Sequence, residues 1–310
     1  MLLTRKRTVL AKIETAYGVD PVPSGAANAI LVGNLTPTPQ SATLVKRNIV
    51  RPYLGNAEEL PTAIYAGIDF EVELAGSGAA GTVPAWGVLM RACGFSETIS
   101  AGVGVTYAPI SNSFESATIY FNEDGVLHKL TGARGTVSID ANANTIPVMK
   151  FKFMGIYSPV VDAAAPTVSF TAFKMPLAVN LTNTPTFSLH GVSTAVLSTL
   201  TLDIANTLAF RQLVGAQQAL ITDRVPVGTV SIEAGPVATH DWWTEAESAT
   251  TAPLQLIHGT TAGNIIELDA PLVQLTNPQY QDLQGVAMLQ MNAVLVPSTA
   301  GNDEFSMQVR

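Results

Sequence analysis

A glycine-rich segment, residues 76–81, is the first place in this sequence where residue types and spacing could do chemistry. It reads G-x-G-x-x-G between an expected strand and an expected helix, the context in which glycines hold a dinucleotide pyrophosphate. However, the preceding residues 68–74 alternate with acids, whereas the strand of such a site is a continuous apolar run. Pro84 delays the helix, and no regular β-α-β series follows. The sequence therefore predicts a flexible surface loop here.

Other side chains that commonly carry catalysis or bind metals are few and scattered. Cys93 is the only cysteine, so neither an intrachain disulfide nor a cysteine metal site is expected. The pair His240–Asp241 is more typical of a polar turn in which Asp241 caps a helix starting at Trp242. The four histidines lack the spacing of zinc ligands: they are His128, His190, His240 and His258. With no nucleophile-elbow, Walker or zinc motif, the sequence predicts no enzyme, no cofactor and no metal.

Composition indicates a protein that buries its surface against copies of itself. Of its 310 residues, 47% are hydrophobic and 13% are charged, whereas soluble domains carry about 25% charged residues. Mean hydropathy is +0.28, yet no run of about 18 apolar residues exists that could cross a membrane as a helix. Large contacts between copies are the simplest place for so much apolar surface.

The charge of the chain is acidic and uneven. A net charge of −8 argues against general nucleic-acid binding. Up to Pro166 there are 12 basic and 13 acidic residues, and beyond it 4 basic and 11 acidic, an asymmetry that can orient one copy against the next. Lys12 and Glu14 interrupt the apolar residues near the start, so no export signal is predicted. The lone cysteine fits assembly in a reducing cytoplasm.

Strand patterns dominate the sequence. Residues 68–74 and 149–153 alternate apolar with charged side chains, the period of a half-buried strand. Asp124–Gly125 is a hairpin-turn signal. One helix is expected over residues 84–93, with Pro84 at its start and Gly94 after its end. Further strands are expected at residues 117–121, 136–139, 199–204, 228–233, 264–268 and 287–296. The prediction is an all-β fold with minor α.

A weak internal repeat suggests two similar domains, residues 1–160 and 161–310, joined by a linker at 158–166. Its best anchor is Arg51 with Gly55, which has the same spacing as Arg211 with Gly215. Residues 67–71 then resemble 229–233, a tryptophan follows in each half, and residues 149–153 resemble 289–293. The alternative is that any two β-rich segments align through their alternation. Each domain is expected to be a β-sandwich or partial barrel with about one helix.

Charged side chains in this pattern allow two interpretations each. The acids that alternate along the strand at 68–74 could line a polar channel or form an ordinary solvated face. The run Arg5, Lys6 and Arg7 could bind an acidic neighbour or belong to a frayed terminus. Glu58 and Glu59 could lie in a turn or in a contact.

The sequence resembles the major tail tube proteins of long-tailed bacteriophages. The resemblance is carried by residues 12–21, KIETAYGVDP, by the charged loop at 47–55, and by the strand, loop and helix over 68–93. It covers mainly residues 8–160, so the second half would be a diverged copy. Such proteins open with an arm, followed by a strand such as residues 29–32.

The resemblance implies a structural virion protein of the tail, assembled in the host cytoplasm. Copies would form stacked rings, with three two-domain chains supplying six domains, and double-stranded DNA would pass through the lumen without specific binding. The partners implied are the chain itself and the tape measure, tail terminator and distal tail proteins. Residues assigned to self-assembly are Arg5, Lys6, Arg7, Tyr17, Arg47, Arg51, Tyr53, Glu58 and Glu59. Acids assigned to the lumen are Asp69, Glu71, Glu73 and Glu233.

Two other classes of β-rich protein compete with this interpretation. An outer-membrane porin would need an export signal and aromatic girdles, and only 7% of residues are aromatic. A different virion component, such as a capsid decoration protein or a tail-fibre module, would have a similarly β-rich sequence.

Overall fold

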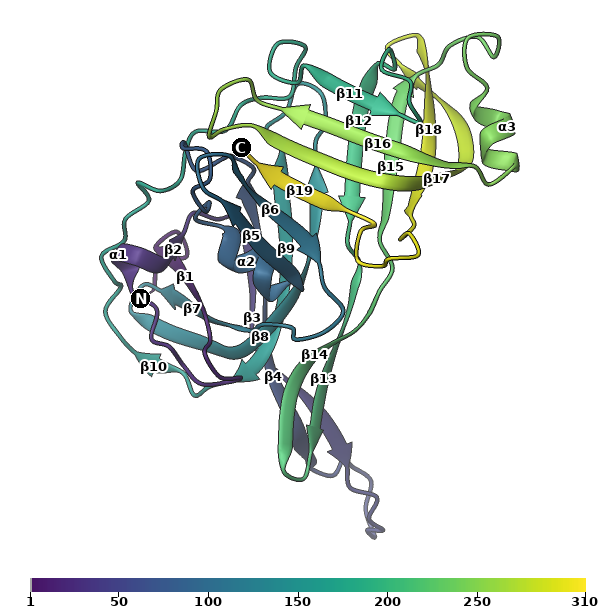
Figure 1. Ribbon diagram of the computed structural model, residues 1–310. Coiled ribbons are helices and arrows are strands. Elements are labelled where there is room, and N and C mark those ends of the chain that lie inside the picture. Colours follow the sequence, from purple (N-terminus) through teal and green to yellow (C-terminus); the bar gives the residue numbers. More distant parts are fainter. Residues whose placement is uncertain (1) are drawn as a thin grey trace.

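The computed structural model describes residues 2–310 and is shown in Figure 1. Strands account for 52% of the chain and helices for 5%, which confirms the predicted all-β fold with minor α. Among the described residues, no helix is long and apolar enough to cross a membrane. In chain order the elements are β1 (Arg7–Ile13), α1 (Gly25–Asn28), β2 (Ala29–Ile30), β3 (Gly33–Lys46), β4 (Glu59–Glu73), α2 (Gly87–Ala92), β5 (Phe95–Ser100), β6 (Gly104–Pro109), β7 (Ala117–Glu123), β8 (Val126–Asp140), β9 (Val148–Tyr157), β10 (Val161–Asp162), β11 (Thr186–Leu189), β12 (Leu197–Asp203), β13 (Asn206–Leu213), β14 (Ala216–Arg224), β15 (Val227–Glu233), α3 (Trp242–Glu247), β16 (Thr251–His258), β17 (Ile266–Leu283), β18 (Val286–Leu295) and β19 (Ser306–Val309).

The first group of strands pairs antiparallel in the order β2–β1–β7–β8–β9–β4–β3. Alternate residues of each strand point to the same face, so one face can be apolar while the other is polar. On the apolar face Ile68 lies opposite Phe153 and Phe70 lies opposite Phe151, and all four side chains are buried. This face forms the core of the first half.

The second group of strands pairs antiparallel in the order β11–β16–β17–β18–β15–β12. Val230 lies opposite Met291 and Ile232 opposite Leu289, again all buried. Between β12 and β15 the chain forms a separate two-stranded hairpin, β13–β14. Strand by strand, the order corresponds to β1–β7–β8–β9–β4–β3 of the first group.

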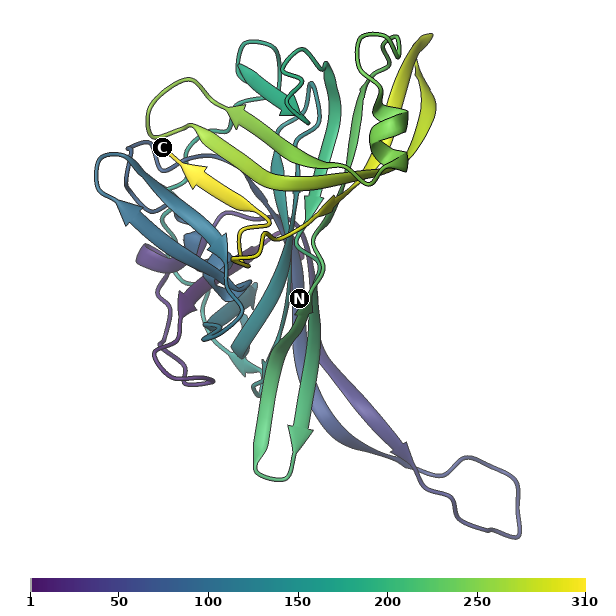
Figure 2. The ribbon, with the colours of Figure 1, turned by 45° about the vertical axis from the view of Figure 1, so that its right-hand side comes forward.

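Two strand contacts join the groups into one 17-stranded sheet. The end of β8 pairs with β12, with Ile139 opposite Leu202. The last strand, β19, pairs with β17 on one side and with β6 on the other, where Met307 lies opposite Tyr107. Figure 2 shows β19 lying between the blue β5–β6 hairpin and the yellow-green β17.

Helix α2 is shorter than the sequence predicts. Residues 84–86 form a turn instead, in which the amide of Gly87 donates to the carbonyl of Pro84 at 2.9 Å. Gly94 has a φ of +83°, which L-residues other than glycine avoid, so the predicted stop at this glycine is confirmed. One stripe of this segment is apolar and buried: it consists of Trp86, Leu89, Met90 and Cys93.

Residues 7–13 are a core strand, whereas the resemblance implied an arm at this end of the chain. Strand β1 pairs with β7 along its whole length, and Val9, Leu10 and Ala11 are buried. Removing this strand would expose that apolar surface and leave the edge of β7 without its partner. The expected arm is therefore corrected, for residues 7–13, to a buried strand that lies between β2 and β7.

The segment expected to be a linker, residues 158–166, is held to the first group of strands. Within it, β10 pairs with β8, and the amide of Ala163 donates to the carbonyl of Gly125 at 2.9 Å. The chain then runs from residue 163 to 185 without a regular strand or helix before β11 begins. The domain boundary at residues 160 and 161 stays a prediction.

The glycine-rich loop at residues 76–81 is packed rather than freely exposed. The amide of Gly76 donates to Oδ1 of Asn264 at 2.7 Å, and the amide of Gly78 donates to the carbonyl of Gly263 at 2.9 Å. A Cβ atom on Gly76 would lie 2.2 Å from that Gly263 carbonyl oxygen. The glycine is needed so that two backbones can approach closely, and it ties the first group of strands to the second.

Other local predictions are confirmed. The turn between β7 and β8 has positive φ at Asp124 (45°) and Gly125 (102°), as the hairpin signal predicts. Asp241 caps α3, since its Oδ1 accepts from the amides of Trp243 at 3.1 Å and Thr244 at 3.0 Å. All eight predicted strand segments overlap strands of the structure.

Candidate assembly surfaces

A polar face runs without a break across the junction between the two groups of strands. Residues directly opposite each other in antiparallel strands lie on the same face of the sheet, so the pairing register shows which side chains share it. One row crosses seven strands, β4, β9, β8, β12, β15, β18 and β17: it consists of Glu73, Val148, Asp140, Thr201, Thr229, Asn292 and Thr276. We call this side of the sheet the acidic face.

The acidic face carries more carboxylates than ammonium groups. Lys150 contacts Asp140 at 2.7 Å, and this hydrogen bond raises the pKa of Lys150. Lys152 lies opposite Asp69 in the register of β4 and β9. The carboxylates placed on this face by register are those of Asp69, Glu71, Glu73, Asp140, Asp203 and Glu233. The four acids that the sequence assigns to the lumen therefore share one face of the sheet. Their role in lining a lumen stays a prediction.

The long hairpin β3–β4 projects from the body of the molecule, as Figure 2 shows at lower right. Its tip carries a small polar network: Arg47 contacts Glu58 at 3.0 Å, Arg51 contacts the same carboxylate at 3.5 Å, and the Arg51 guanidinium lies 5.9 Å from the ring centre of Tyr53. At its base, Lys46 contacts Glu59 at 3.5 Å. Five of the predicted assembly residues thus meet at this tip.

The same tip exposes apolar side chains that a monomer would normally bury. Val50 and Leu54 are 102% and 103% exposed. Leu44, Val45 and Leu60 are exposed as well, and they extend the apolar surface along the strands. Several large apolar side chains exposed on one hairpin are typical of an interaction site.

The hairpin β13–β14 lies beside β3–β4 and ends in a second apolar tip. The rings of Tyr65 and Phe210 are 5.3 Å apart, and Gln217 Nε2 donates to the carbonyl of Ile64 at 3.2 Å. At the tip, Val214 is 108% exposed. Figure 1 shows both hairpins leaving the body in the same direction. The chain therefore presents two apolar tips on the same side of its body (Figure 1).

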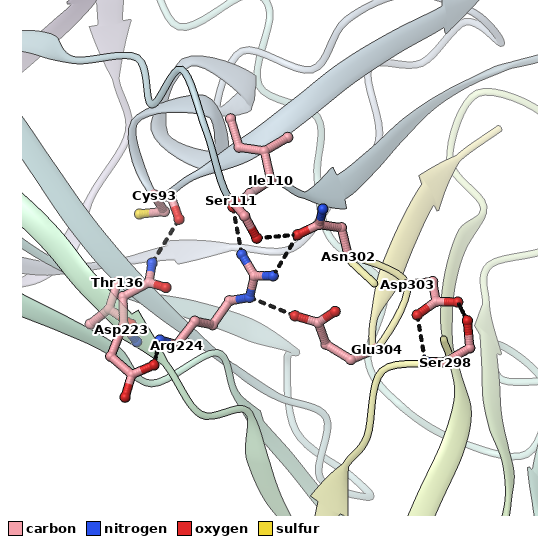
Figure 3. Close-up of polar contacts among 11 residues, drawn as sticks. Cys93, Ile110, Ser111, Thr136, Asp223, Arg224, Ser298, Asn302, Asp303 and Glu304 are labelled. Atoms are coloured by element: carbon pink, nitrogen blue, oxygen red, sulfur yellow. Dashed lines mark hydrogen bonds and ion pairs between the residues drawn. The ribbon is translucent and has the colours of Figure 1, made fainter. Parts of the chain in front are cut away.

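A partly buried polar network anchors the base of β13–β14, as Figure 3 shows. The guanidinium of Arg224, at the end of β14, donates to Glu304 Oε1 at 2.5 Å, to the carbonyl of Ile110 at 2.6 Å and to Asn302 Oδ1 at 3.0 Å. Ser111 Oγ also donates to Asn302. One side chain thus joins the hairpin to the loop after β6 and to the segment before β19.

The other strand of the hairpin is anchored at the same level by Asn206, which lies opposite Arg224. Its side-chain amide donates to the carbonyls of Cys93 at 2.7 Å and Gly135 at 3.0 Å. Its backbone amide donates to Thr136 Oγ1 at 3.0 Å. Both strands of the hairpin are therefore fixed at their base, so its direction relative to the sheet is set by buried hydrogen bonds.

The segment at 12–21, on which the family resemblance chiefly rests, wraps around a buried carboxylate. Glu14 accepts hydrogen bonds from the amides of Gly18 and Gly132, both at 2.7 Å, and from the hydroxyls of Ser116 and Thr118, both at 2.6 Å. The side chain is buried, and its charge is matched by these four donors. The Glu of the segment thus has a structural role.

Tyr17 and Asp20 in the same segment also bind within the chain. The Tyr17 hydroxyl accepts from the amide of Ala219 in β14 at 2.6 Å, and its ring lies 5.0 Å from the guanidinium of Arg134. Burial raises the pKa of Tyr17 and lowers that of Arg134. Asp20 accepts from Tyr120 at 2.5 Å and contacts Lys129 at 3.2 Å. The assembly role predicted for Tyr17 stays a prediction beside this internal one.

The basic residues at the start of β1 have acidic neighbours inside the chain. Arg7 contacts Glu123 at 2.9 Å, and Lys6 contacts Asp124 at 3.5 Å, while Arg5 is exposed. They lie on the β7–β8 turn, away from the tip network of the β3–β4 hairpin. The structure thus divides the predicted assembly residues among three places: the β7–β8 turn, the contact of Tyr17 with β14, and the β3–β4 tip.

Within residues 2–310, no group of three or more His, Cys, Asp or Glu side chains could hold a metal ion. His190 contacts Glu245 at 2.9 Å and its other ring nitrogen bonds the carbonyl of Val273 at 2.8 Å. His258 bonds Thr184 and the carbonyl of Leu177. Burial raises the pKa of Cys93 far above its usual range, which makes its thiol unreactive.

Comparison with known protein families identifies one that matches this sequence. A model of the phage tail tube protein family matches residues 4–291. The chain belongs to the phage tail tube protein family. Among curated proteins, no sequence matches this chain.

Membership in this family confirms that the chain is a structural protein of the phage tail and that it is not an enzyme. It also favours the tail tube over the porin, decoration-protein and tail-fibre alternatives. At this level the family implies self-association, other tail proteins as partners, and a place in the virion.

Sequence reasoning missed the residues that orient the hairpins. Arg224, Asn302 and Glu304 lie far apart in the sequence, and no local pattern relates them. Leu213 and Val214 were also missed, although the apolar residues just before Gly215 were a usable signal, because a turn normally carries polar residues.

Proposed function

We propose that three copies of this chain form a ring, that rings stack into a hollow tail tube, and that double-stranded DNA passes through it. The ring would contain six similar domains, residues 1–160 and 161–310 of each chain. The observation that carries the proposal is the repeated strand order, β1–β7–β8–β9–β4–β3 and β11–β16–β17–β18–β15–β12.

Irregularities in the two sheets support the duplication as well. The pairing of β7 with β8 shifts register between Ala117 and Ile119, and the pairing of β16 with β17 shifts between Ala252 and Leu254. Two unrelated sheets have no reason to share a bulge at corresponding strands, since bulges are specific features of a family. The repeat anchors Gly55 and Gly215 also lie at the tips of the two projecting hairpins.

The acidic face is the surface proposed to line the lumen. It crosses the junction of the two groups of strands, so a ring of copies could extend it around a channel. Carboxylates such as Glu73 and Glu233 would repel the phosphates of DNA, and a protein that offers few cations to phosphates cannot gain affinity from counterion release. DNA could then slide without being held.

The two hairpin tips are proposed to contact a neighbouring ring. Val50, Leu54 and Val214 are fully exposed, and burying them against another copy removes apolar area from water at about 25 cal/mol per Å². Arg47, Arg51 and Tyr53 would surround that contact with polar groups. The tape measure, tail terminator and distal tail proteins remain the partners proposed at the ends and inside of the tube, and assembly is proposed to occur in the host cytoplasm.

Electron microscopy of the purified chain at high concentration tests the proposal. Rings or long hollow tubes are expected in negative stain, and mass photometry at lower concentration should show a species of three 32.5 kDa chains. A chain that stays monomeric under all conditions, including after addition of preformed tail tips, would contradict the proposal.

A further inference from the structure

The junction between β8 and β12 shows how one half of the chain binds the other. Along one edge, β8 pairs with β7 as far as Ala133. Beyond that point β7 has ended, and Ser138 to Asp140 pair with β12. The amide of Ala141 donates to the carbonyl of Leu200 at 2.8 Å, and that of Ile204 to Val137 at 3.1 Å. Strand β12 thus occupies the edge that β7 leaves open.

The second group leaves the corresponding edge open. Strand β17 takes the place of β8 in the strand order, and it pairs with β16 only as far as Gln274. It then continues to Leu283 with β18 on its other side. From Leu275 onward, no strand among the described residues pairs with the edge of β17 that β16 occupies up to Gln274. Gln279, Tyr280 and Gln281 on this stretch are exposed.

The first group leaves the complementary edge open. Strand β12 has β15 on one side and β8 on the other. Strand β3 takes the place of β12 in the strand order, but it has only β4 beside it. Within the described residues, the outer edge of β3 therefore has no strand partner. One chain therefore has two different unpaired edges. The edge of β17 corresponds to that of β8, and the edge of β3 corresponds to that of β12, the two strands that pair in the internal junction.

We propose that β17 of one copy pairs antiparallel with β3 of the next copy, as β8 pairs with β12 inside the chain. This inference rests on the proposed ring and names the edges that would close it. An open strand edge offers unpaired amides and carbonyls to another chain, and pairing the two edges in a closed ring leaves neither exposed. The partner is therefore a second copy of this chain.

Equivalent rows of the sheet set the register of this contact. In the first group, Glu73 ends β4 and its row continues through Val148 to Asp140. In the second, Glu233 ends β15 and its row continues through Met288 to Gln281. Gln281 is therefore the counterpart of Asp140.

The partner of Asp140 on β12 is Thr201, which lies opposite Thr229 of β15. Aligning Glu73 with Glu233 also aligns Asp69 with Thr229, and Asp69 lies opposite Thr36 of β3. Thr36 is thus the counterpart of Thr201. The proposed contact places Gln281 of one copy opposite Thr36 of the next.

Two prolines limit the hydrogen bonds that the outer edge of β3 can form. Pro37 and Pro39 correspond to Leu202 and Ile204, whose backbone groups face β8 in the internal junction. Proline has no amide proton, so these positions of β3 accept but cannot donate hydrogen bonds. At Pro37, a hydrogen bond between copies must therefore run from an amide of β17 to a carbonyl of β3. The same prolines prevent two β3 edges from pairing with each other before the ring forms.

Cysteine cross-linking tests the proposed register. In a Cys93→Ala background, Thr36→Cys and Gln281→Cys place two thiols at a non-hydrogen-bonded antiparallel pair, about 4.5 Å apart between Cα atoms, which suits a disulfide. Mild oxidation of assembled rings should give covalent species of two and three chains on non-reducing gels. The matched control is Gln281→Cys with Thr43→Cys, which lies seven residues further along β3 and is also exposed.

The outcomes separate the inference from the proposed function. Cross-linking of the Thr36 and Gln281 pair without cross-linking of the control supports the inference. Rings that form but do not cross-link, or that cross-link equally in the control, overturn the inference but do not contradict the proposed tube. A Cys93→Ala parent that folds but never forms rings counts against the tube itself. Mixing the two single variants should give dimers only, which keeps the test valid if the double variant assembles poorly.

Discussion

Arg224 donates to Glu304 at 2.5 Å, and the two side chains are only 13% and 4% exposed. They come from segments 80 residues apart and join the base of the β13–β14 hairpin to the segment before β19. Glu304 Oε1 accepts from Arg224 and Oε2 has no hydrogen-bond partner, so the carboxylate depends on Arg224 for its charge compensation. This ion pair is therefore one of the contacts that fix the direction of the hairpin, together with the hydrogen bonds of Asn206.

Replacing Arg224 with Met should destabilise the chain by about 3–5 kcal/mol, because it leaves a buried carboxylate without a counter-charge. Chemical denaturation measures this loss as a lower midpoint. Adding Glu304→Gln to the same chain should restore part of it, since the second change removes the stranded charge. A loss below about 1 kcal/mol for Arg224→Met, with no rescue by the second change, would show that the pair is solvated.

Glu14→Gln should destabilise the fold because Gln directs an amide group at donors that require an acceptor. Hydrogen bonds to charged groups contribute about 1.5–3 kcal/mol each, and Glu14 accepts four of them. Thr15→Ala, one residue further and exposed, is the matched control and should change little. Equal urea midpoints for the two variants would contradict the role given to Glu14.

His258 makes the fold sensitive to mild acid. Burial lowers the pKa of His258 in the folded state below its usual value of about 6.5, and the neutral ring bonds Thr184 and the carbonyl of Leu177. Because the pKa is lower in the folded state, His258 takes up a proton at a higher pH in the unfolded chain than in the folded chain. Stability from this group is present above pH ~6.5 and declines as pH falls toward the folded pKa.

The melting temperature of the wild type should accordingly drop between pH ~7 and ~5 by more than that of His258→Gln, which has no titrating group at this position. Differential scanning calorimetry of both chains measures the difference. Parallel pH profiles for the two chains would show that His258 does not titrate with unfolding.

Reversing charge on the acidic face should make assembled tubes bind DNA. Glu73→Lys together with Glu233→Lys changes two exposed side chains and should leave folding unchanged. Fluorescence anisotropy with short duplex DNA should show binding that weakens steeply with salt. Glu247→Lys with Asp282→Lys changes the net charge equally at exposed positions off this face and should leave DNA unbound. Equal binding by both double variants would contradict the placement of the face.

Charge at the hairpin tips should block stacking without unfolding the chain. Leu54→Asp and Val214→Asp place carboxylates on side chains that are fully exposed in the single chain. Circular dichroism should be unchanged, and negative stain should show single rings without long tubes. Val103→Asp, at another exposed apolar residue, is the control. Long tubes from the tip variants would contradict the proposed contact.

Local patterns in the sequence predicted most strands and turns because period-two alternation and positive-φ residues are short-range signals. The alternation at residues 68–74 and the turn at Asp124 and Gly125 are examples. The helix predicted at residues 84–93 is longer than the helix in the structure, because Pro84 suits a turn as well as a helix start. The strand at residues 7–13 was taken for part of an arm because only its pairing with β7 reveals its burial.

The assembly surfaces could be predicted only in part. The tip residues Arg47, Arg51 and Glu58 are close in sequence, so their meeting follows from one hairpin. The Arg224 network depends on contacts between segments about 80 and 114 residues apart, which no local pattern encodes. The acidic face likewise required the register of several strands before Asp140 and Asp203 joined the predicted acids.

High-resolution cryo-electron microscopy of the assembled tube tests the central claim most directly. The account predicts three chains in each ring, with Glu73, Asp140 and Glu233 of every chain facing the lumen and the two hairpin tips buried against an adjacent ring. Tubes in which this face points outward, or rings with six chains that each contribute only one domain to the wall, would contradict it.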